Sequence, residues 1–260
     1  MVYLEKQWWL FIYSMGKSSD QPMPGDYDGD GKADFTVFRD GATDRTTTNH
    51  WYILKSSDYV FISIGFGLIE QQNTSYFSLP ADYDGDGRTD ISTVTRPYEI
   101  ISGTLTATAT YFDILQSSTN STVRRVLPAT FSASIVPADF DGDSKADFTT
   151  YNSGVWTIEQ STNGATRMIS FGLFDDRTVP ADYDGDGKAD IAVWRPSSGY
   201  WYWLSSRDGS FNSYQFGKSG DNAVPGDYDG DGRILGSSDN LSESGICSNQ
   251  EMAFALCSLV

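Results

Sequence analysis

Short runs rich in β-branched and aromatic residues, some of them alternating with polar residues, recur along the chain and predict β-strands. Residues 35–38 read Phe-Thr-Val-Phe, and residues 191–194 read Ile-Ala-Val-Trp. Longer aromatic runs stand at residues 50–54 and 200–204. Gly, Pro, Asp and Ser interrupt these runs at intervals of about 8–12 residues, a spacing typical of short strands joined by turns. The pattern therefore predicts an all-β protein.

A longer unit, which starts with an acidic loop, repeats along the sequence. The loop reads PGDYDGDGK, PADYDGDGR, PADFDGDSK, PADYDGDGK and PGDYDGDGR, and starts at Pro24, Pro80, Pro137, Pro180 and Pro225. The first aspartates of successive loops are 56, 57, 43 and 45 residues apart. A short strand, an aromatic strand, a Ser/Asp/Gly-rich turn and, in most units, a Phe-Gly pair follow the loop. The sequence thus contains about five repeats, some with insertions.

The N-terminal stretch fits the second half of such a unit. Met15-Gly16 stands ten residues before Asp26, as the Phe-Gly pairs at 171–172 and 216–217 stand ten residues before the next loop. We therefore interpret residues 8–15 as part of a repeat rather than as a targeting sequence. The repeats occupy residues 1–233, and residues 234–260 form a tail that fits no repeat.

Each unit has room for one four-stranded antiparallel sheet, which is too small to bury both of its faces alone. Stacking such sheets around an axis gives a β-propeller, and this architecture matches the period. A linear solenoid is the alternative. The two terminal half-units would close a five-blade ring by joining, or the chain is a fragment of a larger propeller.

The acidic loops place carboxylates so that they converge. Aspartate occupies positions 1, 3, 5 and 9, and glycine at positions 4 and 6 allows sharp turns in every complete loop except the third, which has Ser144. Converging carboxylates repel one another unless a cation offsets the repulsion, and Ca²⁺ accepts six to eight oxygens in irregular geometry. The predicted calcium ligands are Asp26, Asp28, Asp30, Asp34, Asp82, Asp84, Asp86, Asp90, Asp139, Asp141, Asp143, Asp147, Asp182, Asp184, Asp186, Asp190, Asp227, Asp229 and Asp231.

The backbone carbonyl of position 7 is expected to complete each site, at Lys32, Arg88, Lys145 and Lys188. The fifth loop lacks an aspartate at position 9, where Leu235 stands, so its three aspartates form an incomplete set. An EF-hand is excluded, because position 12 is Val or Thr rather than Glu and strand-forming residues follow the loop.

Charge and rare residues exclude several classes of function. The chain has 18 Lys+Arg against 35 Asp+Glu, a formal net charge of −17, which argues against nucleic acid or anionic lipid as the main partner. No apolar run reaches the roughly 18 residues of a membrane-spanning helix, so we expect no membrane insertion. One histidine, His50, and two cysteines near the C-terminus are too few for a zinc finger or an iron–sulfur cluster. No nucleophile elbow or P-loop is present. We therefore expect a protein without enzymatic activity.

The loop pattern Asp-x-Asp-x-Asp-Gly-x-x-Asp, with the upstream Phe-Gly and the Pro before the loop, resembles the FG-GAP family. This family includes integrin α-chain repeats and bacterial VCBS repeats. The resemblance covers residues 8 to 233. It implies a calcium-stabilised β-propeller, placed outside the cell or on its surface, that serves adhesion or ligand recognition.

These observations together favour a calcium-binding, non-catalytic extracellular module that recognises a protein or a carbohydrate. The alternatives are the propeller domain of a polysaccharide-acting enzyme and a purely architectural fragment of a surface protein. Trp8, Trp9 and the run from Tyr200 to Trp203 are candidate platforms for sugar rings, although aromatic residues in alternating runs usually pack between blades.

Overall fold

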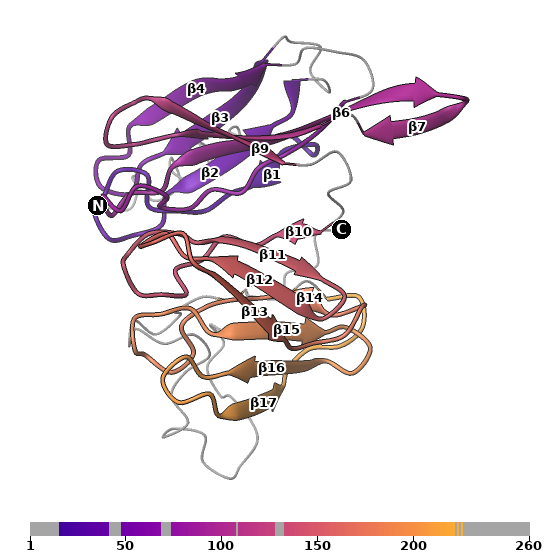
Figure 1. Ribbon diagram of the computed structural model, residues 1–260. Coiled ribbons are helices and arrows are strands. Elements are labelled where there is room, and N and C mark those ends of the chain that lie inside the picture. The colour runs from indigo at the N-terminus through magenta and orange to yellow at the C-terminus, as the bar shows by residue number, and fades with distance from the viewer. Residues whose placement is uncertain are drawn as a thin grey trace. The chain divides into compact units, whose positions relative to one another are not determined.

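A computed structural model shows an all-β chain built from four antiparallel sheets (Figure 1). It describes residues 16–41, 48–68, 74–107, 109–127, 133–221, 223 and 225. The chain divides into two compact units, Met1–Phe131 and Ser132–Val260. Among the described residues, no helix is long and apolar enough to cross a membrane. The half-units expected to make a fifth blade, and the tail at 234–260, lie outside the described residues.

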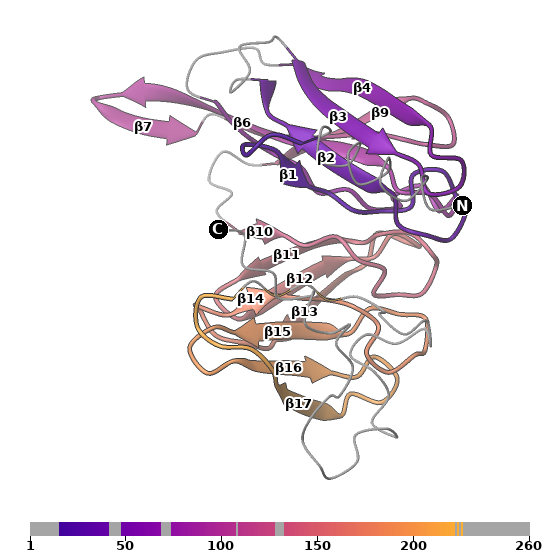
Figure 2. The same cartoon turned by 180° about the vertical axis from the view of Figure 1, so that it is seen from behind.

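The first unit contains two sheets, which are seen from opposite sides in Figures 1 and 2. The first sheet has the order β1-β2-β3-β4 and the second has the order β5-β6-β8-β9, with β7 paired to β6. Their strands are β1 (Gln21–Pro22), β2 (Phe35–Arg39), β3 (Thr48–Leu54), β4 (Phe61–Leu68), β5 (Thr74–Phe77), β6 (Ile91–Ile101), β7 (Thr104–Ala107), β8 (Thr110–Leu115) and β9 (Thr122–Leu127).

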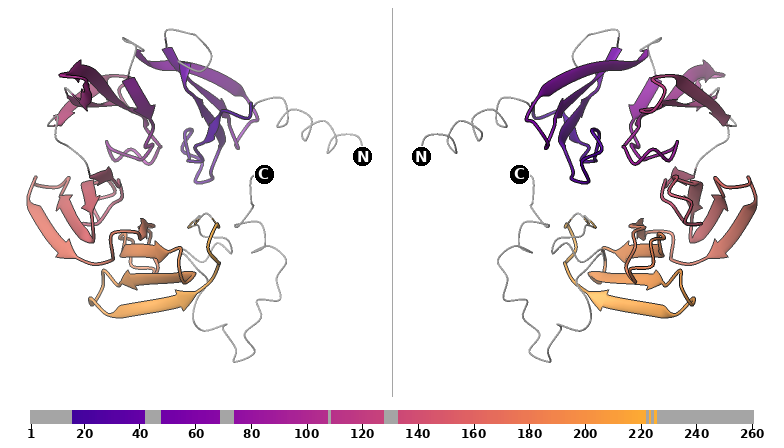
Figure 3. Two further views of the ribbon diagram at one scale, coloured as in Figure 1. Left: turned by 90° about the vertical axis from the view of Figure 1, so that its right-hand side faces the viewer. Right: turned by 90° about the vertical axis from the view of Figure 1, so that its left-hand side faces the viewer.

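The second unit repeats the same plan without insertions, and its last sheet appears in orange in Figure 3. The sheets have the orders β10-β11-β12-β13 and β14-β15-β16-β17. Their strands are β10 (Ser134–Ile135), β11 (Phe148–Asn152), β12 (Val155–Glu159), β13 (Thr166–Ser170), β14 (Arg177–Thr178), β15 (Ile191–Arg195), β16 (Tyr200–Leu204) and β17 (Phe211–Gln215).

Each sheet comes from one repeat, in chain order from strand to neighbouring strand. The acidic loop connects the two-residue first strand to the second strand, as in β14 and β15. This up-and-down arrangement is that of propeller blades and does not fit a parallel β-helix, whose sheets run through successive repeats. The fold prediction of an all-β, propeller-type chain with four-stranded blades is therefore confirmed for four repeats.

Aromatic residues of one sheet pack against aliphatic residues of the next within each unit. In the second unit, Trp156 and Ile158 of β12 share a buried cluster with Ile191 and Val193 of β15. In the first unit, the equivalent cluster joins residues of β2 and β3 to Ile91 of β6. The alternating strands thus bury both faces of a sheet, because a neighbouring sheet covers the face that one repeat cannot cover alone.

The large insertion of the second repeat forms a hairpin. Strand β6 continues beyond its pairing with β8 and pairs with β7 through Tyr98–Ile101. The turn between the two strands is Ser102-Gly103, and both residues have positive φ. The hairpin extends past the rest of its sheet in Figures 1 and 2. The long spacing before the third loop therefore reflects an added hairpin and leaves the four-strand plan intact.

A buried ion pair ties the turn before each of two acidic loops to the strand after it. Arg195 Nε and Nη2 donate to the two carboxylate oxygens of Asp176 at 2.8 and 2.9 Å. The Asp176 side chain is fully buried, and the guanidinium also lies 4.6 Å above the Tyr202 ring. Arg39, Asp20 and Tyr52 repeat this arrangement in the first unit. The pair fixes the turn that precedes the loop.

We expect Asp176→Asn to lower the free energy of unfolding by about 2 kcal/mol, because it leaves the partly buried Arg195 without its counter-charge. Urea denaturation followed by tryptophan fluorescence measures the change. Asp175→Asn is the matched control, since Asp175 is exposed and next in the chain. Equal destabilisation by the two variants would contradict the structural role of the ion pair.

Candidate metal centre

The acidic loop coils around its first aspartate. In the fourth repeat, the Asp182 carboxylate accepts hydrogen bonds from the backbone N–H groups of Gly185 at 2.6 Å and Gly187 at 2.8 Å. Both glycines have positive φ, of 74° and 87°, which a residue with a Cβ adopts only with strain. A bridge between Ala181 and Asp190 closes the loop. The other three described loops have the same turns around Asp26, Asp82 and Asp139.

The third loop keeps this geometry although Ser144 replaces the second glycine. Ser144 has a φ of 69°, close to the values of the glycines at this position. Its N–H donates to Asp139 at 2.8 Å, as the glycine N–H does in the other loops. A left-handed conformation costs a residue other than glycine roughly 1–2 kcal/mol. The departure noted in the sequence therefore strains the third loop without changing its shape.

The aspartate at position 9 joins the loop to the turn after the third strand. One oxygen of Asp190 accepts the N–H of Tyr183 at 2.9 Å, and the other accepts the N–H of Ser206 at 2.6 Å. The carboxylate is fully buried and lies at the start of β15. The equivalent aspartates have the same two kinds of donor in the other loops: Asp34 from Tyr27 and Ser56, Asp90 from Tyr83 and Ser117, and Asp147 from Phe140 and Ser161.

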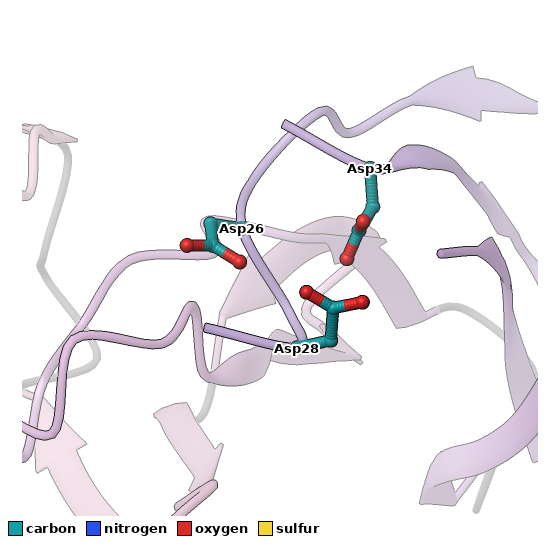
Figure 4. Close-up of side chains that lie close together, drawn as sticks. All are labelled: Asp26, Asp28 and Asp34. Atoms are coloured by element: carbon teal, nitrogen blue, oxygen red, sulfur yellow. The ribbon is translucent and has the colours of Figure 1, made fainter. Parts of the chain in front are cut away.

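Three carboxylates of each described loop come together with ligand atoms within 4.8 Å of one another. Figure 4 shows the first cluster, in which three side chains point toward a common centre. The clusters are Asp26/Asp28/Asp34, Asp82/Asp84/Asp86, Asp139/Asp141/Asp147 and Asp182/Asp184/Asp190. The remaining predicted residues of these loops, Asp30, Asp90, Asp143 and Asp186, lie outside the clusters. Asp227, Asp229 and Asp231 lie outside the described residues.

Hydroxyl side chains of the turn between the third and fourth strands cover each cluster, and our sequence interpretation did not include them. In the third repeat, Thr162 Oγ1 donates to Asp141 at 2.7 Å and Ser161 Oγ donates to Asp143 at 2.8 Å. Ser56/Ser57 and Ser117/Ser118 are the corresponding pairs in the first two repeats. In the fourth repeat Ser206 likewise donates to Asp186. Arg207 stands at the second position, however, and Ser205, one residue before Ser206, donates to Asp184 instead. A recurring Ser-Ser or Ser-Thr after each aromatic strand is the signal that would have found them.

The aspartate at position 3 leaves one carboxylate oxygen without a hydrogen-bond donor in three of the four loops. These oxygens are the buried Oδ1 atoms of Asp84, Asp141 and Asp184. Arg207 forms an ion pair with the last of these, with its Nη2 3.6 Å from Asp184 Oδ1. A buried carboxylate oxygen without a donor is costly, and a cation offsets that cost. The all-oxygen donor set therefore fits a hard cation.

Burial also opposes ionisation of the position 9 aspartates of the second, third and fourth loops. Desolvation raises the pKa of Asp90 and Asp147, and it raises the pKa of Asp190 to about 6. Hydrogen bonds from the backbone N–H groups act in the opposite direction and do not offset the burial. The negative charge of position 3 adds to the increase at Asp90 and Asp190. A metal-free loop thus holds its buried carboxylate at an energetic cost.

The aromatic run proposed as a sugar platform divides between two faces of its sheet. Trp201 is buried, and with the partly buried Trp203 it packs in a core cluster beside Val179 and Trp194. Tyr200 and Tyr202 stack on each other, with ring centroids 5.7 Å apart. Trp8 and Trp9 lie outside the described residues. Within the run, the tryptophans are therefore core residues, while the tyrosines remain candidates for a ligand.

Comparison with known proteins matched a repeat family and several solved structures. A family model described as an FG-GAP-like repeat matches residues 182–234. A solved structure of a lectin from Agrocybe aegerita, whose title concerns recognition of non-reducing terminal N-acetylglucosamine, is 14% identical with a TM-score of 0.44. The match covers 83% of this chain and 73% of the lectin chain. A search of curated proteins found no match.

The family match starts at the first aspartate of the fourth loop. Three further loops repeat its aspartates, its turns and its hydrogen bonds, each within a sheet of the same strand order. The other three repeats therefore share the loop and the sheet arrangement of the matched repeat. The chain is an FG-GAP-type repeat protein.

Proposed function

We propose that the chain is a calcium-binding, non-catalytic module that serves ligand recognition or adhesion outside the cell. The observation that carries the proposal is the cluster of three carboxylates repeated in four loops. In three of these loops the cluster includes a buried oxygen without a hydrogen-bond donor. Bound Ca²⁺ would supply positive charge to each cluster, and four divalent ions would change the formal net charge from −17 to −9.

The donor set favours calcium over magnesium. The loops offer carboxylates, hydroxyls and backbone carbonyls, and Ca²⁺ accepts six to eight such oxygens in irregular geometry. Mg²⁺ requires a nearly ideal octahedron and gives up its water reluctantly. Positions 1 and 3 would hold the ion in every loop, with position 9 in the first, third and fourth loops and position 5 in the second.

The affinity expected of such loops supports a place outside the cell. Extracellular calcium modules bind at roughly 10⁻⁴–10⁻³ M, which matches external rather than cytosolic calcium. The position 9 aspartate joins the acidic loop to the turn after the third strand. An ion bound in the loop would therefore hold both of these connections of a sheet in place. The role of the ion in the proposal is therefore structural.

The environment of the single histidine supports a role without catalysis. The His50 ring stacks on Tyr52 with centroids 6.0 Å apart, and His50 pairs with Arg39 across β2 and β3. A general base needs a nucleophile within hydrogen-bond reach, and the stacked ring is explained by packing alone. The propeller domain of a polysaccharide-acting enzyme remains the alternative, and product analysis on a bound glycan distinguishes it from a binder.

A partly exposed aromatic ladder favours carbohydrate as the ligand class. Tyr202 stacks between Tyr200 at 5.7 Å and Phe211 at 6.1 Å, and the Phe211 side chain is 62% exposed. The first repeat has the same ladder, with Tyr52 between His50 and Phe61. Flat aromatic faces with polar neighbours suit the apolar faces of sugar rings.

We expect excess calcium to raise the melting temperature relative to excess chelator. At a calcium concentration 100 times the dissociation constant, each loaded site adds about 2.7 kcal/mol to the free energy of unfolding. Asp184→Asn combined with Asp186→Asn should remove one calcium from the stoichiometry measured by isothermal titration calorimetry. Asp208→Asn, in an exposed turn outside the clusters, should leave it unchanged. Identical melting curves in calcium and in chelator would refute the structural role.

Acid should weaken calcium binding at the fourth loop. Because burial raises the pKa of Asp190 to about 6, the metal-free carboxyl must release a proton before it ligates a cation. Lowering the pH from about 7 to about 5 should reduce the affinity of this loop about tenfold. Calorimetry in buffers of different ionisation enthalpy should detect the released proton.

The raised pKa of Asp190 also sets the direction in which the stability of the metal-free protein changes with pH. The folded chain holds a proton that the unfolded chain, with the ordinary Asp pKa of 3.8, has already released. The contribution of Asp190 to stability therefore falls as the pH rises from about 4 to about 6 without calcium. A calcium affinity that does not change between pH 5 and pH 7 would contradict the role assigned to Asp190.

Phe211→Ala should abolish binding to any glycan found on an array while leaving the melting temperature within about 2 °C. The ring is largely exposed, so its removal costs contact with the ligand rather than core packing. Met168→Ala is the matched control, since Met168 is 70% exposed on the outer strand of the preceding sheet. Equal loss of binding in both variants would argue against the ladder as the platform.

A further inference from the structure

A backbone hydrogen bond joins the two acidic loops within each compact unit. In the first unit, the N–H of Thr89 donates to the carbonyl of Asp26 at 2.6 Å. In the second unit, the N–H of Ala189 donates to the carbonyl of Asp139 at 2.7 Å. The donor is position 8 of the later loop and the acceptor is position 1 of the earlier loop in both cases. The two candidate metal centres of a unit are therefore directly linked.

The basic side chain at position 7 reinforces this link. A Cβ atom placed on Gly29, position 4 of the first loop, would lie 3.0 Å from Nε of Arg88. A Cβ atom placed on Gly142 of the third loop would lie 2.7 Å from Cε of Lys188. The side chain of the later loop thus lies against the turn of the earlier loop, and glycine makes room for it.

Residue sizes are matched where the two loops meet. A Cβ atom on Gly25 would lie 2.7 Å from Oγ1, 2.9 Å from Cγ2 and 3.1 Å from Cβ of Thr89, so that the Oγ1 and Cγ2 atoms of Thr89 would have to move to admit it. The equivalent residues in the second unit are Ala138 and Ala189. The contact pairs glycine with threonine in the first unit, and the second unit has the small residue alanine at both equivalent positions.

The linking peptide also belongs to the later metal centre. The N–H of Thr89 and the carbonyl of Arg88 share one planar peptide unit, and Arg88 occupies the position expected to supply a backbone ligand. The acceptor, Asp26, is a member of the first cluster. One rigid group thus connects a predicted ligand of the second loop with a predicted ligand of the first.

We infer that cation binding is positively coupled between the first and second loops, and between the third and fourth loops. The inference depends on the proposed function. An ion that orders one loop also holds the linking peptide in place. The neighbouring loop then loses less conformational entropy when it binds its own ion. The peptide N–H also becomes a stronger donor when its carbonyl is polarised. Electrostatic repulsion between the two dications would instead make the second ion bind more weakly. A positive coupling therefore means that the linking peptide outweighs this repulsion.

Glycine amide resonances in NMR spectra of the full chain, titrated with Ca²⁺, report each loop separately. Gly31, Gly87 and Gly187 mark the first, second and fourth loops, since their N–H groups donate to the first aspartate of each loop. In Asp84→Asn, the midpoint of Gly31 should move to calcium concentrations about fivefold higher or more, and that of Gly187 should not move. An unchanged or lower midpoint for Gly31 would overturn the inference.

Two variants without a charge change test the link itself. Gly25→Ala should displace Thr89 and raise the midpoint of Gly31 about fivefold or more. Adding Thr89→Ala gives the first unit the two alanines that the second unit has at these positions, and should return the Gly31 midpoint to its original value. If the double variant is folded and its midpoint stays high, or if Gly25→Ala has no effect, the link does not carry coupling. The Asp84→Asn comparison remains decisive even if Gly25→Ala alone fails to fold.

The same titration separates this inference from the proposed function. If none of the glycine resonances responds to millimolar calcium, the loops do not bind calcium in the expected extracellular range, and the proposed function is wrong. If every loop responds but with a midpoint independent of its neighbour, the proposed function stands and the coupling is wrong.

Discussion

The structure depends on how each acidic loop offsets the repulsion among three carboxylates whose ligand atoms lie within 4.8 Å of one another. Backbone N–H groups offset part of their repulsion by donating to positions 1 and 9, and hydroxyls of the next turn donate to positions 3 and 5. A buried oxygen remains without a donor in three loops. The loops are thus shaped by the protein and left electrostatically incomplete, which is the condition that a hard cation satisfies.

The same carboxylates organise each sheet. Asp190 connects the acidic loop, the start of β15 and the turn between β16 and β17 through two hydrogen bonds. The strands themselves are short and gain stability from buried tryptophans such as Trp156 and from contact with the next sheet. A polar network at one end of each sheet and an apolar layer between neighbouring sheets therefore both stabilise a small repeat. Such dependence on the adjacent repeat is typical of repeat proteins.

Much of the fold and of the candidate site could be predicted because both are local in sequence. The alternation around Trp156 and Trp201 sets which residues face a core, and the fixed spacing of Asp182, Asp184 and Asp190 places them in one turn. The Ser205-Ser206 turn was missed, because its contact with the loop spans about twenty residues and depends on how the hairpin folds back.

The sequence by itself determined the repeat, the strand content and the acidic loops, since these follow from periodicities of a few residues. Only the tertiary structure decided that Asp30, Asp143 and Asp186 lie outside the clusters of their loops, that Ser144 adopts the glycine conformation, and that Thr89 bonds to Asp26. The physical reason differs among these outcomes. Asp30, Asp143 and Asp186 accept hydrogen bonds from hydroxyls of a turn 18–26 residues further along the chain, and the Thr89–Asp26 bond joins two repeats, so both depend on how remote segments fold together. Ser144 adopts its conformation because its N–H completes the loop around Asp139, which a serine in the sequence does not indicate.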